Sequence, residues 1–386
     1  MASLLPSQNT GSGTLYILLE CKPGSGQALY VVDMPELDPD TTTYHVEPRI
    51  LPMKSPIIDF PLDRYASSMA FVQLRSKFYF LGGKLSRDDD GNITQAFHSA
   101  PKNLYVFDPY AYASAPSSTS ASLFLRNGTP MNTLKDRPLV FVALDKIYIL
   151  SSKTEDNCFE VYDPDTETWT VLPNPPLSSH DQWAAWISSA VVNSKVIVAK
   201  SNGFVFCFDI YFNKWFSYVH QFPYPMHGRA VMVEDIIYGC RPGNPAITLT
   251  PNLNIGTGNE LQRFYKHRAI LQPDVSDLCT LSPAYQPGVT QHLVHLGNKC
   301  FCYISAGSPA GIPMDPQPYR HFVSVSIFKV RGDTFIDDHN TRFFSADFQH
   351  SKYVVINCGC QSDEIKILDC IFLSSGVSLC YLFCYF

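Results

Sequence analysis

A short unit recurs along this 386-residue chain: a charged residue is followed at once by a run of three or four apolar residues. A second apolar run that ends on Asp often follows, as in Leu104–Asp108, Phe159–Asp163 and Phe204–Asp209. A repeated unit that cannot bury its own faces must stack against copies of itself, so this pattern predicts a repeat fold. The charged residues that open the runs are Lys77, Lys146, Lys195, Asp235, Lys299 and Lys352.

The runs predict strands that are buried on both faces. Half-exposed strands alternate apolar and polar residues, whereas Phe204–Phe208 is apolar throughout. A buried helix is the alternative interpretation, but the runs are short, rich in aromatic and β-branched residues, and bounded by turn residues. In a β-propeller each blade packs face to face against two neighbours, and this arrangement buries both sides of its middle strands. The sequence therefore favours an all-β propeller over a β-sandwich.

The spacing of the runs gives the expected organisation. If Thr14 opens the first run, the starts are separated irregularly around the propeller period of about fifty residues. We expect residues 1–13 to form a flexible tail and residues 14–373 to form one propeller of six or seven four-stranded blades. The uncharged residues 374–386 form either an apolar tail or a strand that closes the ring.

Composition excludes some classes of partner. The net charge is −6 and charged residues make up 17% of the chain, below the roughly 25% that is typical of globular proteins. Without a basic footprint, we expect neither nucleic acid nor a membrane as a partner. The longest apolar stretches are also too short to span a bilayer.

The cysteines suggest a reducing compartment. The chain has twelve, and Cys207, Cys300, Cys302 and Cys370 lie inside apolar runs, where a free thiol acts as a small hydrophobic residue. The first residues show no basic segment followed by an apolar one, so we expect no signal peptide. Free thiols and a cytoplasmic or nuclear location are therefore predicted.

The unit resembles a divergent kelch repeat, as in plant kelch-type proteins and the galactose-oxidase-like central domain superfamily. The kelch pattern is an apolar strand ending in a Gly pair, then a Tyr-bearing strand, an Asp-Pro turn and a Trp. The residues that carry the resemblance are Gly82-Gly83 after Phe78–Leu81, Tyr162-Asp163-Pro164 with Trp169, and Asp209 with Trp215. The match is degenerate, because Ser151-Ser152 stands where another Gly pair is expected.

The resemblance implies a kelch-like propeller and, in plants, often an F-box that joins it to ubiquitin ligation. We expect no F-box ahead of this propeller, and so no adaptor role of that kind. Related copper oxidases use a Cys-Tyr cofactor with His ligands, and no motif-matched position of this chain carries those ligands. No nucleophile elbow or phosphate-binding glycine loop occurs either. We therefore expect a protein that is not an enzyme and has no cofactor.

Metal binding is also not expected. Asp88–Asn92 resembles the start of a calcium loop, but the bidentate Glu that such a loop needs is absent, so an acidic solvated turn is the preferred interpretation. Cys300 with Cys302 and Cys358 with Cys360 lack the usual two-residue zinc spacing.

Strand order places the candidate binding residues on one rim. In a four-stranded antiparallel blade, the loop between strands two and three lies on the same side as the loop to the next blade. Long loops on one rim of a rigid scaffold favour binding, and exposed Trp and Arg often anchor interfaces. The candidates on this rim are His180, Asp181, Trp183, Trp186, His227, Arg229, Arg320 and His321.

Two alternatives stay open for these residues. Trp183 and Trp186 can instead pack between blades while His180 caps a turn, and Arg229 with Arg320 and His321 can either hold an acidic ligand or be solvated. The sequence predicts a non-catalytic scaffold that binds a protein partner through this rim. The alternative is a sensor or enzyme with a small-ligand site at the central channel, and convergent His, Arg or carboxylate groups at the channel mouth would favour it.

Overall fold

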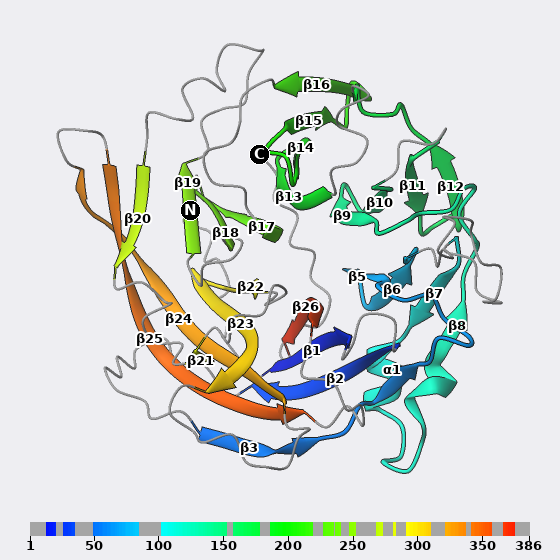
Figure 1. Cartoon of the computed structure of the whole chain (residues 1–386), viewed down its shortest axis with the longest axis horizontal. Coiled ribbons are helices and arrows are strands. Elements are labelled where there is room, and N and C mark those ends of the chain that lie inside the picture. Colours follow the sequence, from blue (N-terminus) through cyan, green and yellow to red (C-terminus); the bar gives the residue numbers. More distant parts are fainter. Residues whose placement is uncertain are drawn as a thin grey trace, which may run out of the picture.

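The structure is a computed structural model in which β-sheets are arranged in a ring around a central axis (Figure 1). It is an all-β propeller, as predicted. The structure describes residues 13–20, 26–34, 49–84, 102–152, 157–177, 186–218, 227–234, 236–240, 247–251, 268–272, 281–282, 291–309, 321–336, 341–356 and 366–374.

Three separate sheets have four strands each. The first contains β26 (Lys366–Ser374), β1 (Gly13–Glu20), β2 (Gln27–Met34) and β4 (Ile58–Phe60). The second contains β5 (Ala70–Leu74), β6 (Lys77–Leu81), β7 (Leu104–Phe107) and β8 (Leu125–Asn127), with α1 (Pro109–Ala113) and the 3₁₀ helix η1 (Ala121–Phe124) between the last two. The third contains β9 (Leu139–Ala143), β10 (Lys146–Leu150), β11 (Phe159–Asp163) and β12 (Thr168–Val171).

The remaining strands are linked into one large sheet of three antiparallel runs. The first run is β13 (Trp186–Val192), β14 (Lys195–Lys200), β15 (Val205–Asp209) and β16 (Lys214–Tyr218). The second is β17 (His227–Val233), β18 (Ile236–Cys240), β19 (Ile247–Pro251) and β20 (Arg268–Gln272). The third is β22 (Gln291–Gly297), β23 (Cys300–Pro309), β24 (His321–Ile336) and β25 (Thr341–Ile356), with β21 (Leu281–Ser282) on β23 and β3 (Arg49–Lys54) on β25.

The blade number differs in detail from the predicted six or seven, because the propeller has five blades. The β13–β16 run is joined to the rest only by a short parallel pairing of β13 with β17, and we count it as a blade of its own. The other two runs share one sheet, because β20 pairs in parallel with β25. The apolar runs after Lys299 and Lys352 also lie in this sheet, in β23 and β25, so the second of them does not open a new blade.

The two ends of the described chain close the ring. Strand β26 pairs with β1 in antiparallel register, with Cys370 opposite Ile17 and Leu373 opposite Thr14. Closure of this kind removes the free edges that a strand at either end of an open sheet would expose. Of the expected tail or closing strand at residues 374–386, Ser374 is the last residue of β26, and residues 375–386 lie outside the described residues.

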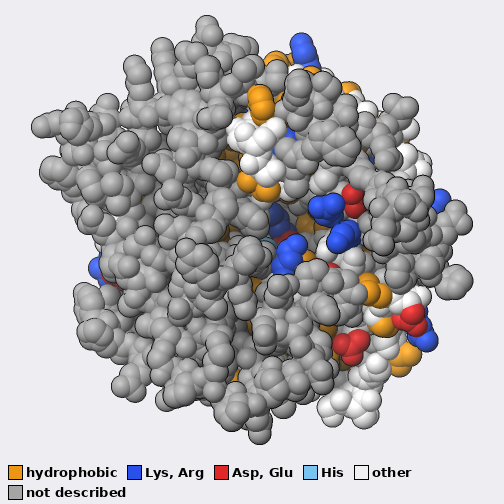
Figure 2. Space-filling view, viewed as in Figure 1, with side chains coloured by type: hydrophobic (Ala, Val, Ile, Leu, Met, Phe, Trp, Pro, Cys, Tyr) orange, Lys and Arg blue, Asp and Glu red, His pale blue; other side chains and the backbone are white. Residues whose placement is uncertain are grey.

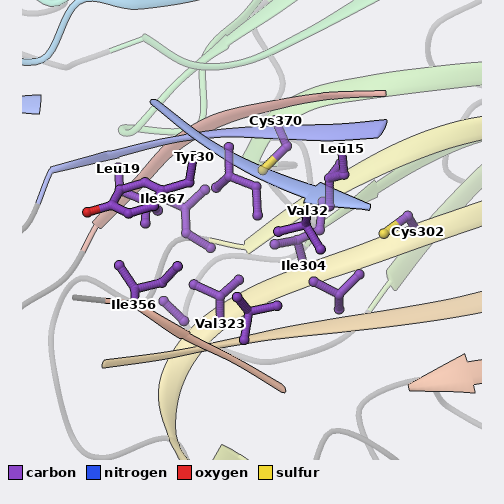
Figure 3. Packing of buried hydrophobic residues seen from close by; sticks show 14 of the residues in the cluster. Leu15, Leu19, Tyr30, Val32, Cys302, Ile304, Val323, Ile356, Ile367 and Cys370 are labelled. Atoms are coloured by element: carbon purple, nitrogen blue, oxygen red, sulfur yellow. The ribbon is translucent and has the colours of Figure 1, made fainter. Parts of the chain in front are cut away.

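The core consists of apolar clusters between neighbouring runs of strands, and single strands contribute to two of them. In β6, Phe78 and Phe80 join one cluster while Tyr79 and Leu81 join the next. Figure 3 shows the cluster in which Leu15 and Leu19 of β1 meet the strands of the large sheet. This confirms the prediction that the apolar runs are buried on both faces.

The Trp and Asp residues of the repeat pattern have two different structural roles. Trp169 in β12 donates its indole N–H to the carbonyl of Thr129 at 2.8 Å, and Trp215 in β16 donates to the carbonyl of Pro173 at 2.7 Å. Each Trp thus reaches the segment that leaves the preceding blade. Asp209 closes its turn, because its Oδ1 accepts from the backbone N–H groups of Tyr211 and Phe212 at 3.1 Å.

Candidate functional site: the two rims of the ring

The ring has two rims, which we define by the strand order. The loop rim is the side on which the innermost strands β5, β9, β13, β17, β22 and β26 begin, and the connections between second and third strands reach it as well. The turn rim is the opposite side and carries the tight turns between the first and second and between the third and fourth strands. The described candidates Trp186, His227, Arg229 and His321 lie at or near strand ends on the loop rim.

The Gly pair predicted from the kelch pattern lies on the loop rim and allows close backbone approach. A Cβ on Gly82 would lie 2.6 Å from Cγ of Pro138, and one on Gly83 would lie 2.5 Å from Cβ of Ala66. In the next blade, where the sequence has a Ser pair, Ser152 Oγ donates to the carbonyl of Arg137 at 2.7 Å. The segment before β9 is therefore held on one side by close packing against Gly82 and on the other by the hydroxyl of Ser152.

The candidate Trp186 is part of the core. Its side chain is 7% exposed and packs edge-on against Phe206, and its indole N–H donates to the carbonyl of Ser151 at 2.8 Å. Nζ of Lys200 lies 4.7 Å from the ring centroid. Trp186 therefore packs between blades, the alternative interpretation, and its ring is not on the surface of the loop rim.

Of six further candidates, four are not described and two are placed by their backbone alone. His180, Asp181, Trp183 and Arg320 lie outside the described residues. His321 is the first residue of β24, opposite Ile356 of β25 in the register. The backbone of the sixth, His227, opens β17 on the loop rim, opposite Cys240 of β18.

Arg229 does not stand free on the rim, because it crosses the channel. Around the axis β17 neighbours β13 and β22, whereas β5 neighbours β9 and β26. Nη2 of Arg229 in β17 nevertheless donates to the carbonyl of Phe71 in β5 at 2.9 Å and forms an ion pair with Asp369 in β26. The Arg229 side chain is 29% exposed and that of Asp369 is 18% exposed. This arginine thus ties the closing strand to two other inner strands.

His292 completes a cluster of three functional groups at this end of the channel. Its Nε2 lies 3.1 Å from the carbonyl oxygen of Ile367, and its Nδ1 lies 3.7 Å from Oδ1 of Asp369. Burial lowers the pKa of His292, and the Asp369 carboxylate opposes this effect. A neutral His292 that donates through Nε2 presents the Nδ1 lone pair to Asp369, so a proton donor between these two acceptors would be stabilised.

Sequence reasoning missed His292 and Asp369. Asp369 gave one signal, because it is a charge inside the apolar run Ile367–Leu373. His292 gave none, since a His at the start of a strand is common and its proximity to Asp369 depends on ring closure.

The turn rim carries exposed apolar side chains that the sequence analysis did not single out. Tyr211 and Phe212, at the tip of the β15–β16 turn, are 72% and 78% exposed. Other large exposed apolar residues on this rim are Tyr110 and Leu123 between β7 and β8, and Leu144 in the β9–β10 turn.

The turn rim also carries ion pairs. Arg75, in the β5–β6 turn, donates Nε to Asp145 at 2.8 Å and Nη1 to Asp165 at 2.5 Å. Lys146 pairs with Asp163 at 2.8 Å. Two cations thus pair with three carboxylates, and the turn rim of the three blades β5–β16 presents both apolar tips and paired charges.

The described cysteines form no further site. Cys207, Cys300, Cys302 and Cys370, which the sequence places inside strands, are buried and form no disulfide, and the same holds for Cys158 and Cys240. Within the described part of the chain, no group of three or more His, Cys, Asp or Glu side chains is arranged to hold a metal ion. The calcium-like segment at residues 88–92 and the pair Cys358 with Cys360 lie outside the described residues. None of the described helices is long and apolar enough to cross a membrane.

Comparison with known families decides where the chain belongs. Residues 13–343 match the family described as "Protein of unknown function (DUF1668)". The chain belongs to this family. No curated protein matches the sequence significantly.

Solved structures with some likeness to this DUF1668 chain have low sequence identity. "Structure of YjhT" is 11% identical, covers 79% of this chain and 89% of its own, and has a TM-score of 0.41. The computationally designed Ika8 protein is 11% identical, with coverages of 81% and 80% and a TM-score of 0.36. The N-terminal domain of Nup159 is 10% identical, with coverages of 74% and 62% and a TM-score of 0.34. The chain's own structure shows the propeller arrangement, and the assignment to kelch repeats stays a prediction.

Proposed function

We propose that this DUF1668 chain is a non-catalytic scaffold that binds a protein partner through the turn rim. The observation that carries the proposal is the pair of neighbouring aromatic rings at the tip of one turn, Tyr211 and Phe212, with most of their surface in water. Aromatic side chains are enriched in the centres of protein interfaces, where they bury large areas with little loss of side-chain entropy.

The turn that presents these rings is fixed. Asp209 is buried, and its carboxylate holds the backbone N–H groups of both aromatic residues. Asn213 then adopts φ of 51°, a left-handed conformation that Asn tolerates and that closes the turn into β16. A rigid tip loses little conformational freedom on binding, which favours affinity.

The proposed binding surface is the turn rim, whereas the sequence predicted the loop rim. The expected class of function, a non-catalytic scaffold, is the same. Trp186 is buried and Arg229 is engaged within the ring, so neither supports a partner platform on the loop rim. A role for His180, Asp181, Trp183 and Arg320 in partner binding stays a prediction. We further propose a cytoplasmic or nuclear location, because a reducing compartment suits the free thiols of the described strands.

The test is a comparison of two surface variants. We expect the wild-type chain to capture a partner protein and the double variant Tyr211→Ser with Phe212→Ser to lose this capture. The captured protein, once purified, should bind the wild-type chain directly in a two-component titration. The matched control is Leu123→Ser with Leu144→Ser, which also removes two exposed apolar side chains from this rim, away from the aromatic tip. Equal capture by the wild-type chain and the aromatic variant would contradict the proposal.

A small-ligand site at the channel is the second candidate function. The observation that favours it is the convergence of Arg229, His292 and Asp369 at the loop-rim end, the arrangement expected of a ligand site rather than of a protein platform. Binding of a small molecule that is lost on substitution of the channel residues, with unchanged protein capture, would support this candidate.

A further inference from the structure

The loop-rim end of the channel exposes cationic side chains from separate blades. Lys84 follows β6, Arg137 precedes β9, and Lys366 opens β26. Lys84 and Lys366 are exposed, and the side chain of Arg137 is 58% exposed. Within the described part of the chain, neither of the two lysines forms an ion pair. Arg229 lies deeper in the channel and is held in place by its contacts with Phe71 and Asp369.

The backbone brings the cations at the blade junction together. Gly83 pairs with Asp136 in a parallel bridge, and the N–H of Arg137 donates to the carbonyl of Gly83 at 2.9 Å. The N–H of Lys84 donates to the carbonyl of Ser67 at 2.6 Å. Lys84 and Arg137 therefore extend from neighbouring positions of two blades.

Arg137 holds its place in a costly backbone conformation. Its φ is 43°, in the left-handed region that residues other than Gly, Asn and Asp seldom adopt. The hydrogen bond from Ser152 Oγ to the Arg137 carbonyl holds this geometry, although the following Pro138 favours an extended residue before it. Strain of this kind is often found at functional positions.

Among the described residues at this end, the carboxylates are covered, whereas Lys84, Arg137 and Lys366 are exposed. Asp136 and Glu20 are buried, and Asp369 is mostly buried beneath its pair with Arg229. The Asp136–Arg137 contact is 4.0 Å long, so this carboxylate neutralises Arg137 only weakly. An ion that approaches from solvent therefore meets positive charge, although the chain as a whole carries a net charge of −6.

Cationic side chains gather near the centre of the ring. In Figure 2, Lys and Arg side chains lie close together beside the central hollow, with Asp and Glu side chains next to some of them. Clustered exposed cations raise the local concentration of anions.

We propose that the loop-rim end of the channel binds a small oxyanion, a carboxylate or a phosphate group, between Lys84 and Arg137, with Arg229 at the inner end of the site. Nη2 of Arg229 contacts Phe71 and Asp369, and no described residue accepts a hydrogen bond from its Nε or Nη1. Planar guanidinium donors suit oxyanions in paired hydrogen bonds, and a flexible Lys adds a point charge. This inference rests on the channel-site candidate and is independent of the turn-rim proposal.

The experiment is a calorimetric titration of the full chain with inorganic phosphate and, separately, with succinate, in a buffer of low ionic strength. We expect at least one of these anions to bind the wild-type chain. Lys84→Gln with Arg137→Gln should weaken that binding at least tenfold and leave the thermal unfolding midpoint unchanged. The matched control is Lys214→Gln with Arg126→Gln, which removes the same charges from exposed turn-rim side chains and should change binding less than twofold.

The outcomes separate the alternatives. Binding of phosphate alone indicates a phosphate-bearing ligand, and binding of succinate alone indicates a carboxylate. No binding of either anion, or equal weakening by both double variants, would overturn the proposal. As a measurement that needs no variant, the bound anion should protect Arg137 of the wild-type chain from phenylglyoxal, with Arg64 as the unprotected reference. Equal modification of both arginines would also contradict the site, and none of these results affects partner capture by the turn rim.

Discussion

Lys135→Met should be among the most destabilising single substitutions in the propeller. Lys135 precedes β9 and pairs with Glu160 of β11, and both side chains are 0% exposed. The ammonium also donates to Thr133 Oγ1 at 2.5 Å and to the carbonyl of Asn157 at 2.8 Å. Burial alone would raise the pKa of Glu160, but the hydrogen bond and charge of Lys135 outweigh it and lower that pKa below the usual 4.5.

The expected magnitude follows from what the substitution leaves behind. Removal of one partner of a buried pair costs about 3–5 kcal/mol, because the other charge stays buried without compensation. Glu160 would keep hydrogen bonds from Thr133 Oγ1 at 2.8 Å, from Asn132 Nδ2 at 2.9 Å and from both backbone N–H groups. We therefore expect a loss near the lower end, about 3 kcal/mol in the free energy of unfolding.

The assay is urea denaturation followed by tryptophan fluorescence, with Lys146→Met as the matched control. Like Lys135, Lys146 pairs with a carboxylate of the same blade, that of Asp163, but the Lys146 side chain is 42% exposed. Its substitution should therefore lower the free energy of unfolding by less than about 1 kcal/mol.

The pH dependence gives a second readout. In the wild-type chain the lowered pKa of Glu160 means that its contribution is complete above pH 4.5 and is lost as the pH falls. In Lys135→Met, burial without the cation should raise this pKa, so the variant should regain stability as the pH falls from 7 to 5. Equal costs for the two substitutions, or a cost of Lys135→Met that does not shrink between pH 7 and 5, would refute the reasoning.

Three further predictions concern ring closure, blade contacts and thiols. Asp369→Asn should lower the free energy of unfolding by about 1–3 kcal/mol, because Arg229 loses its charged partner, and hydrogen exchange in β26 should become faster than in β10. Trp169→Phe and Trp215→Phe should each cost about 1 kcal/mol in urea denaturation through the lost indole hydrogen bond, and a cost near zero for both would contradict an inter-blade role. Burial raises the pKa of Cys207 and of Cys240 to about 12, so mass spectrometry should find both unlabelled by iodoacetamide at pH 8 until urea is added.

Much of the fold was predictable because the relevant information is local. The run after Lys77 has apolar residues at every position, and the structure divides them between two clusters, with Phe78 in one and Tyr79 in the other. Period-two geometry makes this division inevitable once the strand forms between two packed neighbours. The turn role of Asp209 was likewise readable from its position at a strand end.

The candidate site was less predictable because its contacts join distant segments. Arg229 was singled out for its residue type, but its bond to Phe71 spans the channel and depends on the ring having closed. Trp186 was singled out as an exposed anchor, whereas its buried ring packs against the preceding blade and donates to the carbonyl of Ser151. Tyr211 and Phe212 follow an Asp in an ordinary turn, and only the exposed surface shows that nothing in the described structure covers them.

By itself, the sequence determined the class of structure. It specifies short apolar strands that are buried on both faces, joined by Asp-containing turns and stacked as repeats around an axis. These features depend on residues within a few positions of one another. Only the tertiary structure decided that β20 pairs with β25, that β26 closes the ring on β1, and that Arg229, His292 and Asp369 meet at the channel. Pairing between edge strands that are far apart in the sequence depends on which strand edges are left unpaired after every blade has packed. The residues around any one strand do not contain that information.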